Sequence, residues 1–199
     1  MSLERSAKRR GEGGYTIVEL MMGLALFIAG MLALIGMQRL QARANGDART
    51  LAIAQRIAET WASQLQMESL QWQDNLTTAQ WLGNVDNGWA RPAYQTDRVG
   101  AAFDALGRPL KDTEVAQARF CTNIRLTYLF QPNVPTSGNG LMRAEIRVFW
   151  LRDGEEVLNA SDGLCPTTAV AADMVEIGKA VDRYEFVYQT TGLRQHSAI

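Results

Sequence analysis

The sequence has few of the residues that build catalytic and metal sites. It contains two cysteines, Cys121 and Cys165, neither in a C-x-x-C pair, and one histidine, His196. A structural zinc site needs four Cys or His ligands at close spacings, so zinc is not expected. There is no G-x-S-x-G, P-loop, H-E-x-x-H or nucleotide-binding glycine motif in the sequence. We therefore predict no enzyme activity, no cofactor and no metal site, and we assign no catalytic residue.

The chain also lacks an excess of either charge. It has 20 basic and 21 acidic residues and a formal net charge of -1. A nucleic-acid-binding protein normally carries a basic stripe or patch, so no nucleic-acid partner is expected. The hydrophobic fraction of 47% over 199 residues is that of a folded chain, with enough residues for one domain with a core.

The N-terminal part has no proline between Tyr15 and Trp89 and contains a long apolar run. Residues 1–14 form a short basic leader that ends in two glycines, and residues 15–37 are apolar except for Thr16 and Glu19. A helix over this run is about 35 Å long, enough to cross a bilayer. Basic residues precede the run, which places the N-terminus in the cytoplasm and the rest of the chain outside it.

Two simple interpretations leave part of this run unexplained. A secretory signal peptide has Ala42-Arg43-Ala44 as an A-x-A cleavage pattern, but the run exceeds a normal apolar region and Gln38-Arg39 intervene. A plain single-pass anchor explains the length but not Glu19. A carboxylate in an apolar span costs about 2–3 kcal/mol on insertion scales.

The segment Gly14-Tyr15-Thr16-Ile17-Val18-Glu19-Leu20 resembles the processing motif of type IV prepilins. The resemblance implies that an inner-membrane prepilin peptidase cleaves between Gly14 and Tyr15 and methylates the new amine of Tyr15. Glu19 lies about one helical turn from that amine and can neutralise it, in its own chain or in a neighbouring subunit. Such pairing makes a charge beside hydrocarbon tolerable.

Within that family, residues 29–38 and then Ala48-Arg49 onward are similar to minor pilins of the PilV type, a similarity that covers the N-terminal third of the chain, while the remainder shares only the architecture. The long leader and the tryptophan-rich centre also favour a minor subunit. The resemblance implies a priming or tip complex with other minor pilins and the major pilin, joined through the N-terminal helix on an inner-membrane assembly platform. It places the C-terminal domain in the periplasm before assembly. Because Glu19 is present, we expect a position below the extreme tip.

Two alternatives remain open at this point. A minor pseudopilin of a type II secretion system has the same N-terminal pattern. A membrane-anchored periplasmic adhesin or sensor domain has the same anchor, never assembles, and predicts no peptidase cleavage.

Beyond the apolar run, the pattern predicts that the helix continues over residues 38–70 with one face on a domain core. The apolar positions recur at three- and four-residue steps: Leu40, Ala44, Leu51, Ala54, Ile57, Ala58, Trp61 and Leu65. Residues 71–119 are expected to connect helix and sheet, with a turn around Gly107. We expect most aromatic residues of this connection to pack in the core or under loops: Trp72, Trp81, Trp89, Tyr94 and Phe103.

Residues 120–191 are predicted to form an antiparallel sheet. Two strands are expected at Phe120–Phe130 and Leu141–Leu151, the second with one buried and one polar face. The turn Asp153-Gly154 predicts a strand at Glu156–Ala160, and a last strand is expected over Arg183–Gln189. Residues 192–199 are expected to be a flexible tail. The fold class is therefore α+β and similar to type IV pilins, with one long helix whose apolar half projects and whose amphipathic half packs on the sheet.

The compartment bears on the cysteines. If the chain beyond the apolar run lies outside the cytoplasm, Cys121 and Cys165 meet an oxidising environment. A bridge between them would stabilise the domain by about 4 kcal/mol in the chain-entropy account. It would resemble the disulfide-bounded C-terminal region of many pilins. The alternative, a pair of free thiols, has no companion histidine or local motif in its favour.

Overall fold

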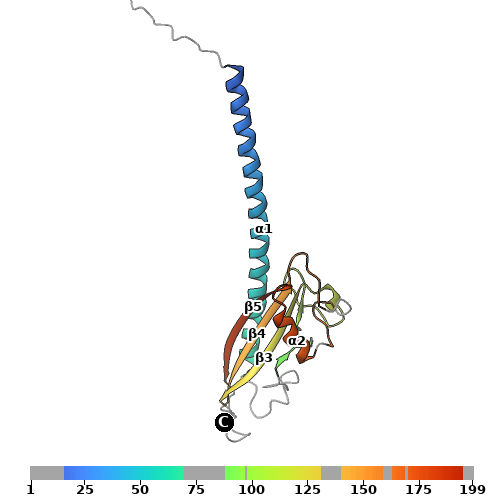
Figure 1. Cartoon of the computed structure of the whole chain (residues 1–199). Helices are drawn as coiled ribbons and strands as arrows, with labels where there is room; N and C mark the ends of the chain where they lie inside the picture. The colour runs from blue at the N-terminus through green and yellow to red at the C-terminus, as the bar shows by residue number, and fades with distance from the viewer. Residues whose placement is uncertain are drawn as a thin grey trace, which may run out of the picture. The chain divides into compact units, whose positions relative to one another are not determined.

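A computed structural model of the chain divides it into two compact units, residues 1–48 and residues 49–199. Apart from the side chain of Ala171, the structure describes residues 16–69, 88–96, 98–130, 140–158, 163–168 and 170–194. The first helix, α1 (Ile17–Ser69), contributes residues to both units (Figure 1). Several sequence predictions fall outside the described residues: those on the leader 1–14, Trp72, Trp81 and His196.

The described part of the first unit is helical from Ile17 onward. Leucine, alanine and methionine dominate this segment and favour helix, and α1 continues through Gly36 without a break. Every side chain from Ile17 to Met37 is exposed in the single chain. The helix predicted over the apolar run is confirmed for the residues that the structure describes.

The second unit contains a five-stranded antiparallel sheet in the order β1-β3-β4-β5, with β2 also paired to β3. The strands are β1 (Trp89–Ala90), β2 (Ala102–Phe103), β3 (Phe120–Phe130), β4 (Leu141–Leu151) and β5 (Tyr184–Arg194). The described residues of this unit also form two short helices, η1 (Val115–Gln117) and α2 (Ala171–Lys179). The α+β class and the bounds predicted for β3 and β4 are confirmed.

One face of the sheet forms the main core with the last turns of α1. The buried α1 stripe runs from Ala54 through Trp61 to Leu65. It packs against the inward side chains of β4, which are Met142, Ala144, Ile146, Val148 and Trp150. This confirms a packed amphipathic segment but shortens it, because Leu40, Ala44 and Leu51 are exposed. Leu40 and Ala44 belong to the first unit, whose described residues include no strand.

The other face of β4 is not the uniformly polar face that the sequence predicts. Arg147 is 2% exposed and Phe149 is 1% exposed. Phe149 belongs to a second apolar cluster with Cys121, Cys165, Ile177 and Tyr184. Charged residues alternate with apolar ones only as far as Arg147, and then Phe149 brings a large apolar side chain to the same face. This end of the sheet is therefore buried on both sides.

The strand predicted at Glu156–Ala160 is wrong for the residues that the structure describes, since 155–158 are not extended into the sheet. β4 is already paired with β3 on one edge and β5 on the other, so no edge of β4 is free for another strand. Helix α2, which the sequence analysis missed, follows instead. It is short, and Asp173 accepts a hydrogen bond at its start from the backbone N of Val170 at 3.0 Å.

Two further sequence predictions concern a turn and the end of the last strand. The turn around Gly107 is confirmed, because Asp104 N donates to Arg108 O at 2.9 Å and Gly107 adopts a φ of 75°. The expected end of the last strand is wrong. β5 extends to Arg194, and Gly192 pairs with Arg143 of β4, so residues 192–194 are strand and not tail.

Candidate functional site

The first turn of α1 holds the one charged residue of the apolar segment. Thr16 precedes the helix, and the backbone N of Glu19 donates to Thr16 O at 3.0 Å and to Thr16 Oγ1 at 3.4 Å. Thr16-x-x-Glu19 is therefore an N-terminal capping pattern, which the sequence analysis overlooked although its spacing is visible. A carboxylate in the first turn also interacts favourably with the helix dipole. Glu19 thus has a local structural role beside any pairing between subunits.

The segment that follows has the properties of a membrane helix. It is one helix near the N-terminus, long and apolar enough to cross a bilayer, which is consistent with a single-pass anchor. Its side chains are free to meet lipid or other helices, because none from Ile17 to Met37 is buried in the chain. Three alanines at four-residue intervals, Ala25, Ala29 and Ala33, give it a line of small residues. Such lines let neighbouring helices approach closely.

The cleavage and methylation assignments stay predictions. Gly14 and Tyr15 lie outside the described residues, which begin at Thr16. Of the residues assigned to processing and assembly, Glu19 is therefore the one whose local geometry is described.

The two cysteines form a disulfide, as predicted. Cys121 in β3 and Cys165, which precedes α2, have Cα atoms 5.3 Å apart and are separated by 44 positions in sequence. Both are buried in the second apolar cluster. The bond holds the segment after β4 against β3.

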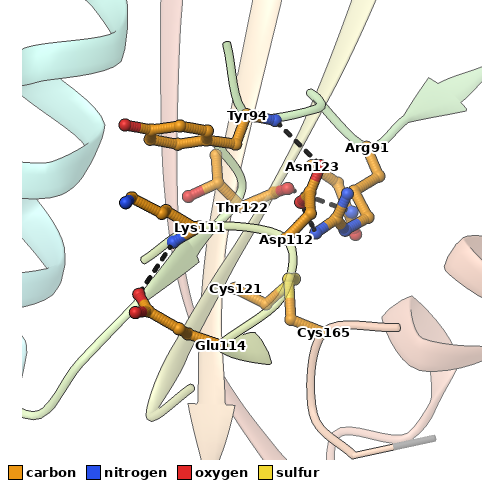
Figure 2. Close-up of polar contacts among 9 residues, drawn as sticks. All are labelled: Arg91, Tyr94, Lys111, Asp112, Glu114, Cys121, Thr122, Asn123 and Cys165. Carbon is orange, nitrogen blue, oxygen red and sulfur yellow. Dashed lines mark hydrogen bonds and ion pairs between the residues drawn. A yellow bond between two sulfur atoms is a disulfide. The ribbon is translucent and has the colours of Figure 1, made fainter. Parts of the chain in front are cut away.

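A polar network lies beside this disulfide (Figure 2). Arg91 Nη2 contacts Asp112 Oδ1 at 2.7 Å, and the same carboxylate accepts a bond from Tyr94 N at 3.2 Å. The Arg91 side chain is only 6% exposed, whereas that of Asp112 is 35% exposed. The carboxylate therefore neutralises a nearly buried guanidinium and ties residues 91–94 to the loop before η1. This is a structural arrangement with no nucleophile and base in contact.

Arg147 occupies the centre of the sheet beneath α2. Its Nη2 donates to Asn123 Oδ1 at 2.8 Å and to Met174 O at 2.6 Å. Its Cζ lies 4.4 Å from the centroid of the Trp89 ring. Burial lowers the pKa of Arg147, and interaction with Tyr188 opposes that shift. The guanidinium thus joins β1, β3, β4 and α2, a role that the sequence pattern did not indicate.

A cleft of about 720 Å³ lies between α1 and residues 98–99. Glu68 Oε1, on its wall, contacts Arg98 Nε at 3.3 Å and accepts a bond from Gln64 Nε2 at 3.0 Å. Hydroxyl, amide and oppositely charged groups line the cleft together with the apolar side chains of Met67 and Val99, and no histidine or cysteine is among the lining residues. Among the described residues there is also no group of three or more His, Cys, Asp or Glu side chains arranged to hold a metal ion.

Comparisons with known proteins find no matching family, no similar curated protein and no similar solved structure.

Proposed function

We propose that this protein is a minor pilin, an assembly subunit of a type IV pilus that joins other minor pilins in a complex priming filament growth. One observation carries the proposal. Glu19 is the one charged residue in an otherwise apolar, wholly exposed helical segment, and it stands in the first turn. The long apolar helix, the antiparallel sheet and the disulfide are compatible with a pilin-like fold.

The chemistry of assembly follows from this placement. In the bilayer, the apolar side chains of residues 17–37 contact lipid, and peptidase cleavage gives Tyr15 a free amine, a group whose ordinary pKa is about 8. On assembly, the same side chains pack against helices of neighbouring subunits. Glu19 then pairs with the amine of Tyr15 of a neighbour. A carboxylate removed from water has a strong preference for such a partner, so the pair fixes the axial position of each subunit.

The substitution Glu19→Gln tests this role. It keeps the size and hydrogen-bonding groups of the side chain but removes the charge. We expect at least about a tenfold loss of recruitment into the complex, because an unpaired buried amine costs more than about 1.4 kcal/mol. Recruitment is measured by co-purification of the other minor pilins with the full chain from membranes.

Glu59→Gln is the matched control, because Glu59 is exposed on the same helix but in the second unit. The control should recruit partners as the unsubstituted chain does. Full recruitment of the Glu19→Gln chain, with the disulfide intact, would contradict the proposed charge pairing.

Deletion of the gene tests whether the chain belongs to a type IV pilus or to a type II secretion pseudopilus, because both systems share this N-terminal pattern. We expect fewer surface pili and unchanged secretion of exoproteins. Normal piliation with lost secretion would assign the chain to a secretion pseudopilus, and no change in either would favour an anchored domain that does not assemble.

A further inference from the structure

The sheet carries a second candidate surface, away from the α1 core. We call it the outer sheet face and define it by Trp89, Arg125, Arg143, Glu145 and Tyr188. Trp89 is paired with Arg125, and Arg125 with Glu145, so these side chains project to the same side. Arg143 and Glu145 are two positions apart in β4, which also places them on one side.

This face is accessible in the described structure. The side chains of Arg143 and Arg125 are 42% and 39% exposed, and Tyr188 is 57% exposed. Helix α2 covers the end of this side of the sheet that holds Phe149 and Cys121, and it also contacts β1 and buries Arg147. The remainder is open among the described residues.

The charges on the outer sheet face do not balance. Glu145 Oε2 contacts Arg125 Nε at 2.5 Å, and its other oxygen lies 3.7 Å from Arg143 Nη2. One carboxylate thus serves two guanidinium groups. Arg147 lies beneath them and donates to neutral acceptors, Asn123 Oδ1 and Met174 O. The two guanidinium groups and one carboxylate of this face leave a surplus of one positive charge, and the buried Arg147 beneath adds a second, in a chain whose formal net charge is -1.

Arg143 has the most unused binding capacity of these residues. Its ion pair is the longer of the two at Glu145. Its side chain is 42% exposed, so the guanidinium can be reached from outside, although its Nε atom is buried and has no hydrogen-bond partner among the described residues. A guanidinium binds a carboxylate best through two parallel N–H groups. Because Glu145 reaches this exposed guanidinium through one contact at 3.7 Å, an incoming carboxylate can gain contacts at Arg143 that Glu145 does not supply.

Aromatic rings lie beside these cations. The Trp89 centroid is 4.9 Å from Arg125 Cζ and 6.3 Å from the Tyr188 centroid. The guanidinium of Arg147 stacks on the Trp89 ring, with its Cζ atom 4.4 Å from the ring centroid. Tyrosine, tryptophan and arginine are the residues that most often dominate binding energy at protein interfaces.

We infer that the outer sheet face binds an acidic segment of a partner protein. Carboxylates of that segment bind Arg143 and Arg125, and its backbone lies across the rings of Tyr188 and Trp89. A polypeptide fits better than a nucleic acid, because Glu145 stands among the arginines and would repel a continuous row of phosphates. This binding requires no entry into a filament, so it goes beyond the proposed function.

Peptide titrations on the full-length protein in detergent test the inference. The probes are a fluorescein-labelled octapeptide of alternating Glu and Ser and its counterpart with Gln in place of Glu, followed by fluorescence anisotropy. We expect the acidic peptide to bind with a Kd on the order of 100 μM at low salt. The Gln peptide should bind at least about tenfold more weakly. Raising the salt should weaken acidic binding, since the contacts are at the surface.

Arg143→Glu should weaken binding of the acidic peptide by about tenfold, through loss of one attraction and gain of one repulsion. Arg119→Glu is the matched control. The Arg119 side chain is 48% exposed and also makes one long ion pair, at 3.5 Å to Asp153. The Arg119→Glu chain should bind the acidic peptide as strongly as the unsubstituted chain does. Arg143→Gln, which removes charge without adding repulsion, should lie between the two and guards against a folding defect.

Three results would overturn the inference. The first is absent or equal binding of the two peptides. The second is equal weakening by Arg143→Glu and Arg119→Glu. The third is displacement of the acidic peptide by an oligothymidylate of equal charge at the same concentration, which would indicate a site for polyanions in general.

Discussion

Gly178 of α2 packs directly against the side chain of Arg147. A Cβ atom at position 178 would overlap Arg147 Nη1. That atom is at the end of a long side chain, but the side chain is fixed by its bonds to Asn123 and Met174 and by Trp89 over it. Gly178→Ala must therefore displace the guanidinium, whereas a glycine elsewhere in a helix is simply less favourable than alanine.

The expected magnitude follows from two opposing terms. Overpacking against a fixed buried group costs about 1–3 kcal/mol. Alanine in a helix gains up to about 1 kcal/mol over glycine. Gly178→Ala should therefore destabilise the protein by about 1 kcal/mol. Arg147→Ala alone should cost about 2–4 kcal/mol through lost charged hydrogen bonds and the cavity left behind.

The double substitution separates these terms. Once Arg147→Ala has removed the guanidinium, the new methyl at position 178 meets open space and only the helix term remains. Gly178→Ala should then stabilise the chain by up to about 1 kcal/mol, a coupling of about 2 kcal/mol between the two sites. The assay is guanidinium unfolding of the full chain in detergent, followed by tryptophan emission. Equal destabilisation by Gly178→Ala in both backgrounds would refute the packing argument.

Three further outcomes are expected in the same unfolding assay. Replacing Cys121 and Cys165 by serine should lower the free energy of unfolding by about 4 kcal/mol, and reduction of the disulfide in the unsubstituted chain should reproduce that loss. Gly107→Ala should cost about 1–2 kcal/mol, because φ is 75° there and the added methyl would press on an α1 side chain. Asp112→Ala should cost about 3 kcal/mol by leaving the nearly buried Arg91 unpaired; a loss below about 1 kcal/mol would show that water replaces the carboxylate.

The sequence predicts a strand best when its side chains alternate between the buried core and the opposite face of the sheet. In β4, Met142, Ala144, Ile146 and Val148 recur at every second position, and the structure buries all of them against α1. The period of two is a direct consequence of strand geometry, so it can be read without knowledge of the partner. The helix over the apolar run follows in the same way from length and composition.

Arg147 shows where such prediction ends. Its position in the alternating pattern predicts that its side chain faces away from the α1 core, and this prediction is correct. Its charge also predicts exposure to solvent, and that prediction is wrong. It is buried by Trp89, from a distant part of the chain, and by α2, a helix of nine residues with few buried side chains to reveal it. Burial here depends on contacts between distant segments, which periodicity does not contain.

For Glu19, unlike Arg147, the candidate role depends on residues that are close in sequence. Its candidate role came from a local motif, and the structure adds a second local fact, the cap from Thr16. The remaining partner in the proposed pairing, the amine of Tyr15, is created by cleavage and lies outside the described residues. The structure of a single unprocessed chain therefore does not contain this amine or the pair it would form with Glu19.

The most direct test is therefore mass spectrometry of the N-terminal peptide, from cells with and without the prepilin peptidase. The account predicts a mature terminus at N-methylated Tyr15 that depends on the peptidase. An intact leader in both strains would contradict it and leave a membrane anchor. A terminus near Asn45 would contradict it as well and indicate a signal peptide.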